Sequence, residues 1–293
     1  MFKGSIPALV TPMRDDGTID FAAWDALLDF HLRAGTDGVV VGGTTGESPV
    51  LERGELEELV RRAKARVAGR IPVIAGSGTN GTEKTIALSR VAAAAGADAL
   101  LVVTPYYNKP TQEGLFRHFT AVADAVDVPV ILYNVPGRTA CDMLADTVAR
   151  LSHHPRIVAV KEATGDVARG VAILQLSRPG FVLLSGDDPT AAELIRIGAT
   201  GVISVTANVA ARAMHELCAA GLDGRHGEAA AINERLVPLH KALFVEANPI
   251  PVKWAVHRLG LIGPALRLPL TPLSPGLHAT VEAAMVAAGV DLP

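Results

Sequence analysis

The chain has 293 residues, of which 49% are hydrophobic and 4% aromatic, so its core must be built from Ala, Val, Leu and Ile. That mixture suits parallel strands covered on both faces. The formal net charge is -3, so nothing in the composition resembles a basic nucleic-acid-binding surface. Cys141 and Cys218 fit no metal or redox spacing, so we expect two buried thiols. Without a signal sequence or a long apolar run, we expect a cytoplasmic protein that does not bind membranes.

Short apolar runs alternate with Ala-rich amphipathic segments along the first two thirds of the chain. This alternation is typical of βαβ units and a parallel sheet. Strands are expected at 6–10, 38–41, 72–75, 99–103, 129–133, 157–161, 181–185 and 201–205, and helices at 21–34, 55–67, 83–95 and 113–126. Because about eight such units can close on themselves, we predict an α/β fold, a (β/α)8 TIM barrel. An open, doubly wound sheet is the competing architecture.

One helix-to-strand junction recurs at Gly35, Gly96 and Gly198. Each glycine is expected to end a helix in the left-handed conformation, before a tight turn and a buried strand. After residue 205 the chain is predicted to be helical, at 207–220, 227–245, 251–259 and 275–288. We therefore expect barrel strands and most helices in residues 1–206. Residues 207–293 would supply the last barrel helix and a C-terminal helical extension, in one structural unit.

Two glycine-rich segments follow predicted strands. Residues 76–81 spell G-x-G-x-x-G, but the next strand does not end in the acidic residue that would hold a ribose. We therefore expect an ordinary loop rather than a dinucleotide site. Residues 42–48, Gly-Gly-Thr-Thr-Gly-Glu-Ser, suit a small carboxylate, because Thr44 and Thr45 add hydroxyl donors without a cation. Plain helix capping by Thr45 or Ser48 is the alternative.

Lys161 ends an apolar run that predicts a buried strand. Lysine is rarely buried without a reason, and the carboxyl end of a barrel strand faces the active-site side. Burial lowers the pKa of an amine, and a partly neutral amine can attack a ketone and form a Schiff base. The alternative is a lysine that snorkels at a strand end or pairs with Glu162.

All three tyrosines of the chain stand at or just after the ends of predicted strands. Tyr133 ends the strand before that of Lys161, so the two side chains are expected at similar height. A phenol there can relay a proton to and from an iminium or alkoxide. Tyr106 and Tyr107 follow the strand at 99–103. Arg138 lies in the loop after Tyr133, where its guanidinium suits a substrate carboxylate.

Motifs spread over the whole chain resemble one known family. They are G-G-T-T-G-E-S at 42–48, T-P-Y-Y-N at 104–108, Y-N-V-P-G-R-T at 133–139, V-K-E-A at 160–163, S-G-D-D at 185–188, G-V-I-S-V at 201–205 and E-A-N-P-I-P-V-K at 246–253. The chain resembles the dihydrodipicolinate synthase family of pyruvate-dependent class I aldolases. The resemblance implies a lyase that condenses pyruvate with L-aspartate 4-semialdehyde to 4-hydroxy-tetrahydrodipicolinate, in diaminopimelate and lysine biosynthesis.

By matching positions, the resemblance assigns catalytic roles. It implies that Lys161 forms the Schiff base with pyruvate, and that Thr44 and Thr45 hold the pyruvate carboxylate. It also implies a proton relay of Thr44, Tyr133 and Tyr107. In this family the Tyr107 position is supplied to the neighbouring subunit's site across a tight dimer.

The resemblance also implies the remaining substrate contacts. Arg138 would receive the carboxylate of the aldehyde substrate, and the main-chain carbonyl of Ile203 would lie near the lysine. Gly186, in the S-G-D-D motif, is expected among the substrate-binding residues. The implied chemistry requires no metal or organic cofactor, and the implied assembly is a homo-oligomer, a dimer of dimers.

One group of positions departs from the family members that lysine inhibits. Those members bind lysine at the dimer interface through polar residues, of which Ser48, Asn80 and Tyr106 are present here. Three partners differ: two histidine positions hold Arg53 and Leu56, and the carboxylate that meets the effector's ammonium is replaced by Lys84. A cation facing a cation is repulsive, so we expect weak or absent inhibition by lysine.

The nearest alternatives share the barrel and the lysine: N-acetylneuraminate lyase and keto-deoxy-sugar-acid aldolases. Arg138 favours a small aldehyde with a carboxylate over a polyhydroxylated sugar. A non-catalytic barrel is disfavoured because the catalytic residues are all present. Metal-dependent aldol chemistry is also disfavoured, because the nine histidines are scattered and the pair His153-His154 lies in a predicted loop.

Overall fold

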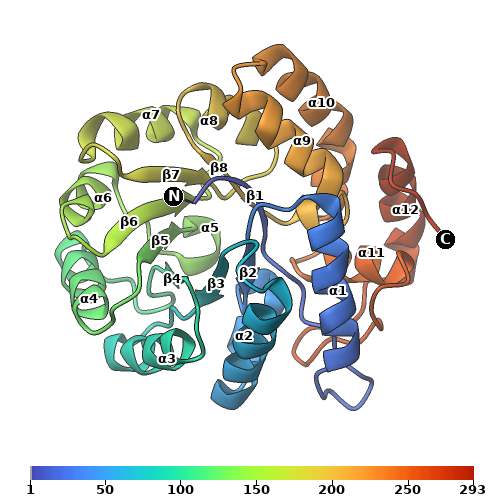
Figure 1. The fold of residues 1–293 in the computed structure, drawn as a ribbon, viewed down its shortest axis with the longest axis horizontal. Coiled ribbons are helices and arrows are strands. Elements are labelled where there is room, and N and C mark those ends of the chain that lie inside the picture. The colour runs from blue at the N-terminus through green and yellow to red at the C-terminus, as the bar shows by residue number, and fades with distance from the viewer. Residues whose placement is uncertain (1) are drawn as a thin grey trace.

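Eight short buried strands lie parallel in the order β1-β8-β7-β6-β5-β4-β3-β2. A parallel bridge between Ala8 and Val40 joins the two ends of this order, so the sheet curls into a nearly closed barrel ringed by helices (Figure 1). The computed structural model describes residues 2–293. The strands are β1 Gly4–Pro7, β2 Val39–Val41, β3 Val73–Gly76, β4 Ala99–Val103, β5 Val130–Asn134, β6 Ile157–Glu162, β7 Val182–Ser185 and β8 Gly201–Ser204. The predicted (β/α)8 barrel is confirmed, and the open sheet is excluded.

Helices follow the strands and form the outer ring of the barrel (Figure 1). They are α1 Phe21–Ala34, α2 Arg53–Val67, α3 Thr82–Ala94, α4 Gln112–Asp124, α5 Pro136–Thr139, α6 Ala145–Ser152, α7 Val167–Leu176, α8 Ala191–Arg196 and α9 Ala211–Leu222. The C-terminal part adds α10 His226–Ala242, α11 Ile250–Arg258 and α12 His278–Ala287, of which α12 packs on α10 and α11. None of the helices described in residues 2–293 is long and apolar enough to cross a bilayer.

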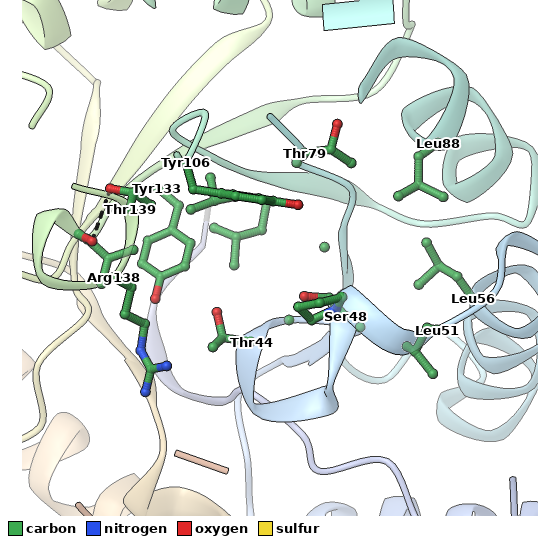
Figure 2. A pocket seen from close by; sticks show the side chains of 18 of the residues that line it. Thr44, Ser48, Leu51, Leu56, Thr79, Leu88, Tyr106, Tyr133, Arg138 and Thr139 are labelled. Atoms are coloured by element: carbon green, nitrogen blue, oxygen red, sulfur yellow. Dashed lines mark hydrogen bonds between the residues drawn. The ribbon is translucent and has the colours of Figure 1, made fainter. Parts of the chain in front are cut away.

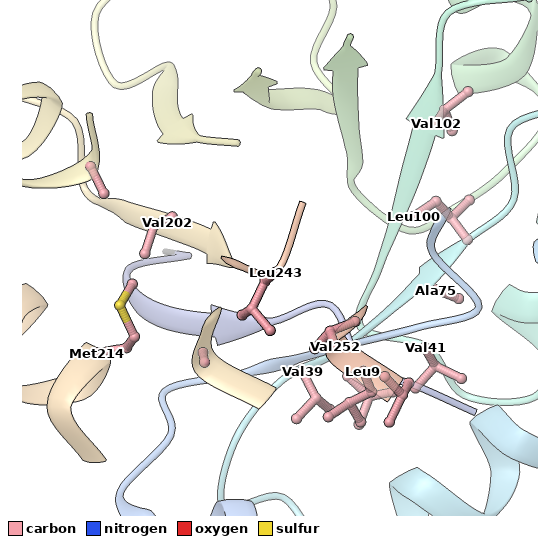
Figure 3. Close-up of a cluster of buried hydrophobic side chains, with 14 of the residues drawn as sticks. Leu9, Val39, Val41, Ala75, Leu100, Val102, Val202, Met214, Leu243 and Val252 are labelled. Atoms are coloured by element: carbon pink, nitrogen blue, oxygen red, sulfur yellow. The ribbon is translucent and has the colours of Figure 1, made fainter. Parts of the chain in front are cut away.

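Side chains alternate along the strands between two separate hydrophobic layers, as the period of two in a strand requires. One layer fills the barrel interior and includes Ile6, Val40, Ile74, Leu101, Ile131 and Leu184. The other lies between the strands and the helices and includes Leu9, Val39, Val41, Leu100 and Val202 (Figure 3). Val252 of α11 belongs to this second layer, so the C-terminal part shares the main core with the strands.

The expected glycine junctions are present: Gly35, Gly96 and Gly198 have φ of 85°, 95° and 120°. Several predicted elements are shifted, among them the first strand and three of the C-terminal helices: the helix expected at 207–220 spans Ala211–Leu222, and the one expected at 227–245 ends at Ala242. The first strand was expected at 6–10, but its pairing moves partway along: the N–H of Ala8 still donates to Ser204, whereas that of Leu9 donates to Val40 of β2. The last predicted helix starts as the 3-10 turn Pro275–Leu277 and is α-helical only from His278.

His31 of α1 is fully buried, and its Nε2 atom has no hydrogen-bond partner within residues 2–293. Burial lowers the pKa of His31 to about 3. Between this value and the ordinary value near 6.5 the unfolded chain binds a proton that the folded protein does not. Acidification from about pH 7 to about pH 5 is therefore expected to cost about 2 kcal/mol of stability through this residue.

Urea unfolding of a His31→Gln variant at both pH values tests this expectation. The variant should lose that part of the pH dependence, whereas His153→Gln, at an exposed position, should keep it. An unchanged pH dependence in His31→Gln would show that the buried imidazole does not control acid stability.

Candidate active site

Lys161 and Tyr133 lie side by side at the carboxyl ends of neighbouring strands. The register of β5 and β6 pairs Tyr133 with Lys161, and each strand ends one residue later. Tyr133 faces the barrel interior, and so does Ala159, which lies two residues before the lysine. Because every second side chain of a strand points to the same face, Lys161 also points inward. The Lys161 Nζ atom lies 4.1 Å from the centre of the Tyr133 ring. The sequence prediction that these two side chains stand at similar height is confirmed.

Lys161 is only 6% exposed, and within residues 2–293 it forms no ion pair. The pairing with Glu162 considered from the sequence does not occur. Adjacent residues of a strand point to opposite faces, and the Glu162 carboxylate accepts hydrogen bonds from Asn134 and from the Thr164 N–H instead. The amine therefore lies against an aromatic face and beside a cavity, not against a carboxylate.

A polar cluster behind the lysine was not found from the sequence. The Asn134 amide donates to Glu162 at 3.1 Å and to Asp142 at 2.9 Å, and Arg169 donates to both oxygens of Asp142 at 2.8 and 2.7 Å. Burial raises the pKa of the Glu162 carboxyl, and the hydrogen bonds from Asn134 and Thr164 oppose that rise. This cluster ties the ends of β5 and β6 together directly behind the two site residues.

Thr44 and Thr45 begin a 3-10 turn, Thr44–Gly46, which two glycines separate from the end of β2. The Thr45 hydroxyl is buried and accepts a hydrogen bond of 3.0 Å from the side-chain amide of Asn248. Neither Thr45 nor Ser48 caps a helix here, because α2 begins after Glu52, whose N–H is bonded by the Glu55 side chain. The capping alternative is therefore wrong, and Asn248 is a neighbour of the site that sequence reasoning missed.

Arg138 lies on the short helix α5 Pro136–Thr139, which follows β5. Its guanidinium donates to the main-chain oxygen of Asn248 at 3.3 Å. The side chain is exposed and lines both cavities described below. The structure thus brings a cation to the mouth of the barrel, on the same side as the Thr44 turn.

Two adjoining cavities open at the carboxyl ends of the strands. The smaller, about 110 Å³, is lined by Lys161, Thr45, Gly186 and Asn248, and the larger, about 620 Å³, by Ser48, Leu56 and Tyr107. Thr44, Tyr133 and Arg138 line both. In Figure 2 the hydroxyl end of Tyr133 points toward Thr44 and the guanidinium of Arg138. The arrangement places a primary amine, a phenol, hydroxyls and a guanidinium around one small space.

Tyr106 and Tyr107 lie at the rim, in the loop after β4. Tyr107 is 87% exposed and has a φ of 76°, and within residues 2–293 no hydrogen bond joins its hydroxyl to Thr44 or Tyr133. Tyr106 is 36% exposed and lines the larger cavity. One chain alone therefore assembles two of the three residues expected in the relay.

Gly186 follows β7 and packs directly on the lysine. A Cβ atom at this position would lie 2.9 Å from Lys161 Cε and 2.6 Å from Ala163 Cβ. Glycine therefore leaves the room that the lysine side chain occupies. Ile203, on β8, lies in the interior layer of the barrel and is 1% exposed, and its expected role near the lysine stays a prediction.

The segment at 76–81 has a packing role. A Cβ atom on Gly76 would lie 2.2 Å from the Gly42 carbonyl oxygen, and one on Gly78 would lie 2.4 Å from the Val103 nitrogen. These glycines allow the loop to approach the ends of the neighbouring strands closely. Within residues 2–293, no group of three or more His, Cys, Asp or Glu residues could hold a metal ion.

Comparison with known protein families gives a match over nearly the whole chain. The model of the dihydrodipicolinate synthetase family matches residues 1–288. The chain belongs to this family. The resemblance stated from the sequence motifs is thereby confirmed, and the protein is an enzyme.

Individual relatives agree with this assignment. A 4-hydroxy-tetrahydrodipicolinate synthase from Ectopseudomonas mendocina is 57% identical over 290 residues, which cover 99% of both chains. The crystal structure of chloride-inhibited dihydrodipicolinate synthase from Acinetobacter baumannii, complexed with pyruvate, has 47% identity and a TM-score of 0.98, over 99% of this chain and 100% of that one. A monomeric dihydrodipicolinate synthase variant has 42% identity and a TM-score of 0.97, over 99% and 98% of the two chains.

Proposed function

We propose that the enzyme condenses pyruvate with L-aspartate 4-semialdehyde to 4-hydroxy-tetrahydrodipicolinate through a Schiff base on Lys161. The observation that carries the proposal is the lysine itself: buried, without a carboxylate partner, and placed against Tyr133 at the wall of the smaller cavity. The names of the relatives give this product, 4-hydroxy-tetrahydrodipicolinate. We propose that it enters diaminopimelate and lysine biosynthesis.

The Lys161 amine attacks the keto carbon of pyruvate, and loss of water leaves an iminium. This cation withdraws electrons, so the pyruvate methyl group loses a proton and becomes an enamine carbon. That carbon attacks the aldehyde carbon, and the resulting alkoxide takes up a proton. The amine of the aldehyde substrate then displaces the lysine, which closes the ring and frees the enzyme. The lysine supplies the electron sink, so this sequence needs no cofactor.

The surrounding side chains divide the remaining tasks. Thr44 and Thr45 line the small cavity and would hold the pyruvate carboxylate, while Arg138, which lines both cavities, would receive the carboxylate of the aldehyde. The Tyr133 hydroxyl, which points toward Thr44 in Figure 2, would carry protons to and from the iminium and alkoxide.

Tyr107 would complete this relay in a neighbouring subunit of a homo-oligomer. Its side chain is 87% exposed and would be free to reach another chain. We propose a tight dimer that exchanges this tyrosine, and a pair of such dimers as the full assembly. Sedimentation of the wild-type chain and of Tyr107→Phe measures the assembly, and a loss of turnover without a change of mass is expected for the variant.

Feedback inhibition by lysine is expected to be weak. Leu56 lines the larger cavity together with Leu51 and Leu88, on the side away from Arg138 (Figure 2), so this wall offers no partner for a charged ligand. Arg53 and Lys84 are both exposed cations that would repel the lysine ammonium. Steady-state turnover at millimolar L-lysine should stay close to that without it. Strong inhibition at micromolar lysine would contradict this expectation.

A panel of aldehydes tests the proposed function. Purified protein is supplied with pyruvate and either L-aspartate 4-semialdehyde or sugar aldehydes such as N-acetylmannosamine, and pyruvate consumption is measured. Turnover confined to the semialdehyde is expected, because Arg138 matches its carboxylate. Turnover only with sugar aldehydes would keep the Schiff base but overturn the substrate assignment and the role of Arg138.

A further inference from the structure

A buried ion pair joins the turn after β2 to the first turn of α11. The Lys253 amine donates to one oxygen of the Glu47 carboxylate, and both side chains are 0% exposed. The other carboxylate oxygen accepts the main-chain N–H of Arg267 at 3.0 Å. Among the ion pairs within residues 2–293, this is the only one with both partners completely buried.

Such a pair is a poor source of net stability. Removing two charges from water costs several kcal/mol for each ion, and apolar residues of the same volume often stabilise a protein at least as well. Burial lowers the pKa of Lys253, and the neighbouring Glu47 carboxylate opposes that shift. The placement of the pair suggests what it does instead.

Glu47 follows directly after the Thr44–Gly46 turn and belongs to the turn's own hydrogen bonding. Its N–H donates to the Thr44 carbonyl at 3.1 Å, and its φ is 61°. A residue with a side chain rarely adopts this left-handed conformation without outside support. The Lys253 amine and the Arg267 N–H, which both bind the Glu47 side chain, supply that support.

The same end of α11 reaches the site at two other points. Asn248, just before this helix, donates to the Thr45 hydroxyl at 3.0 Å and accepts from Arg138 through its carbonyl at 3.3 Å. Asn248, just before α11, and Lys253, in its first turn, therefore contact Thr45 and Glu47. Asn248 also contacts the guanidinium proposed for the second carboxylate.

We propose that Glu47 and Lys253 are positioning residues, whose ion pair holds the Thr44–Thr45 turn in the shape that receives the pyruvate carboxylate. Neither side chain lines the two cavities, so both act through the turn and not on the substrate. This inference rests on the proposed function, because it assumes that the turn binds pyruvate.

The test is a steady-state comparison of Glu47→Gln with the wild-type enzyme. Pyruvate KM is expected to rise about tenfold, because the turn is no longer held by the ion pair. A tenfold rise corresponds to a loss of about 1.4 kcal/mol of binding free energy. The KM for the aldehyde should change by less than about twofold. A purely structural role would instead reduce the amount of folded enzyme, which lowers apparent kcat and leaves the pyruvate KM unchanged.

Two further variants separate positioning from folding. Glu47→Gln combined with Lys253→Met leaves no unpaired buried charge, so it should be more stable than the single variant and still show the raised pyruvate KM. Lys64→Met is the matched control. It removes the partly exposed pair with Asp98, at the amino ends of β3 and β4, and should leave the pyruvate KM unchanged.

A folded double variant with a wild-type pyruvate KM would overturn the inference while leaving the proposed function intact. If Glu47→Gln alone does not fold, the pyruvate KM of the double variant tests the inference instead. A wild-type enzyme that does not consume pyruvate at all would contradict the proposed function itself. The two failures are therefore distinguishable in one set of assays.

Discussion

Replacing Lys161 with alanine is expected to lower kcat by more than about a thousandfold, because the amine that would form the Schiff base is removed. Lys161 is the one lysine that lines either of the two described cavities. Lys161→Arg should be equally inactive, since a guanidinium stays protonated and cannot act as the nucleophile. Pyruvate consumption with L-aspartate 4-semialdehyde is the measurement.

The control for this prediction is Lys241→Ala, at an exposed position of α10 far along the chain from the site residues. Its turnover should stay within about twofold of wild type, as is usual for surface substitutions. Substantial residual turnover in Lys161→Ala, with the fold intact by circular dichroism, would show that another group performs the chemistry.

Replacing Gly186 with alanine is expected to lower kcat about a hundredfold, although the substitution adds only one methyl group. The new Cβ atom would lie 2.6 Å from Ala163 Cβ and 2.9 Å from Lys161 Cε. Such approaches force the lysine side chain to move, and a displacement of a catalytic group by about 1 Å can cost about a hundredfold in rate. The fold should survive, at a cost of about 1–3 kcal/mol for overpacking.

Steady-state kinetics and thermal unfolding of Gly186→Ala measure the two effects separately. Gly54→Ala is the matched control, since a Cβ at Gly54, in the first turn of α2, meets nothing within 4 Å. The control should retain full activity. Wild-type turnover in Gly186→Ala would show that Lys161 accommodates the added methyl group and that the close contact with Gly186 does not affect catalysis.

Much of the fold could be predicted from the sequence because the signals for it are local. Short apolar runs separated by amphipathic segments are specific to parallel α/β folds, and α1 was placed at its observed bounds, Phe21–Ala34. The pairing of Tyr133 with Lys161 followed from their equivalent positions on consecutive strands. The boundaries of β1 could not be predicted, because its partner changes from β8 to β2 partway along.

The contacts that organise the site were harder to predict from the sequence. Asn248 and Thr45 are 203 residues apart in the sequence, and Lys253 and Glu47 are 206 apart, so no local sequence pattern predicts either contact. Asn134 and Glu162 lay inside recognised motifs, yet their hydrogen bond depends on the register of two strands. The contacts of Asn248 and Lys253 depend on how the C-terminal part of the chain returns to the barrel mouth, which only the three-dimensional structure reveals.

The most direct test of the account is to trap the Schiff base. Wild-type enzyme is incubated with pyruvate and borohydride, digested, and its peptides are analysed by mass spectrometry. The account predicts one reduced pyruvate adduct per chain, on Lys161, with parallel loss of activity. An adduct on another lysine, or no adduct while the enzyme remains able to consume pyruvate, would contradict the proposed role of Lys161.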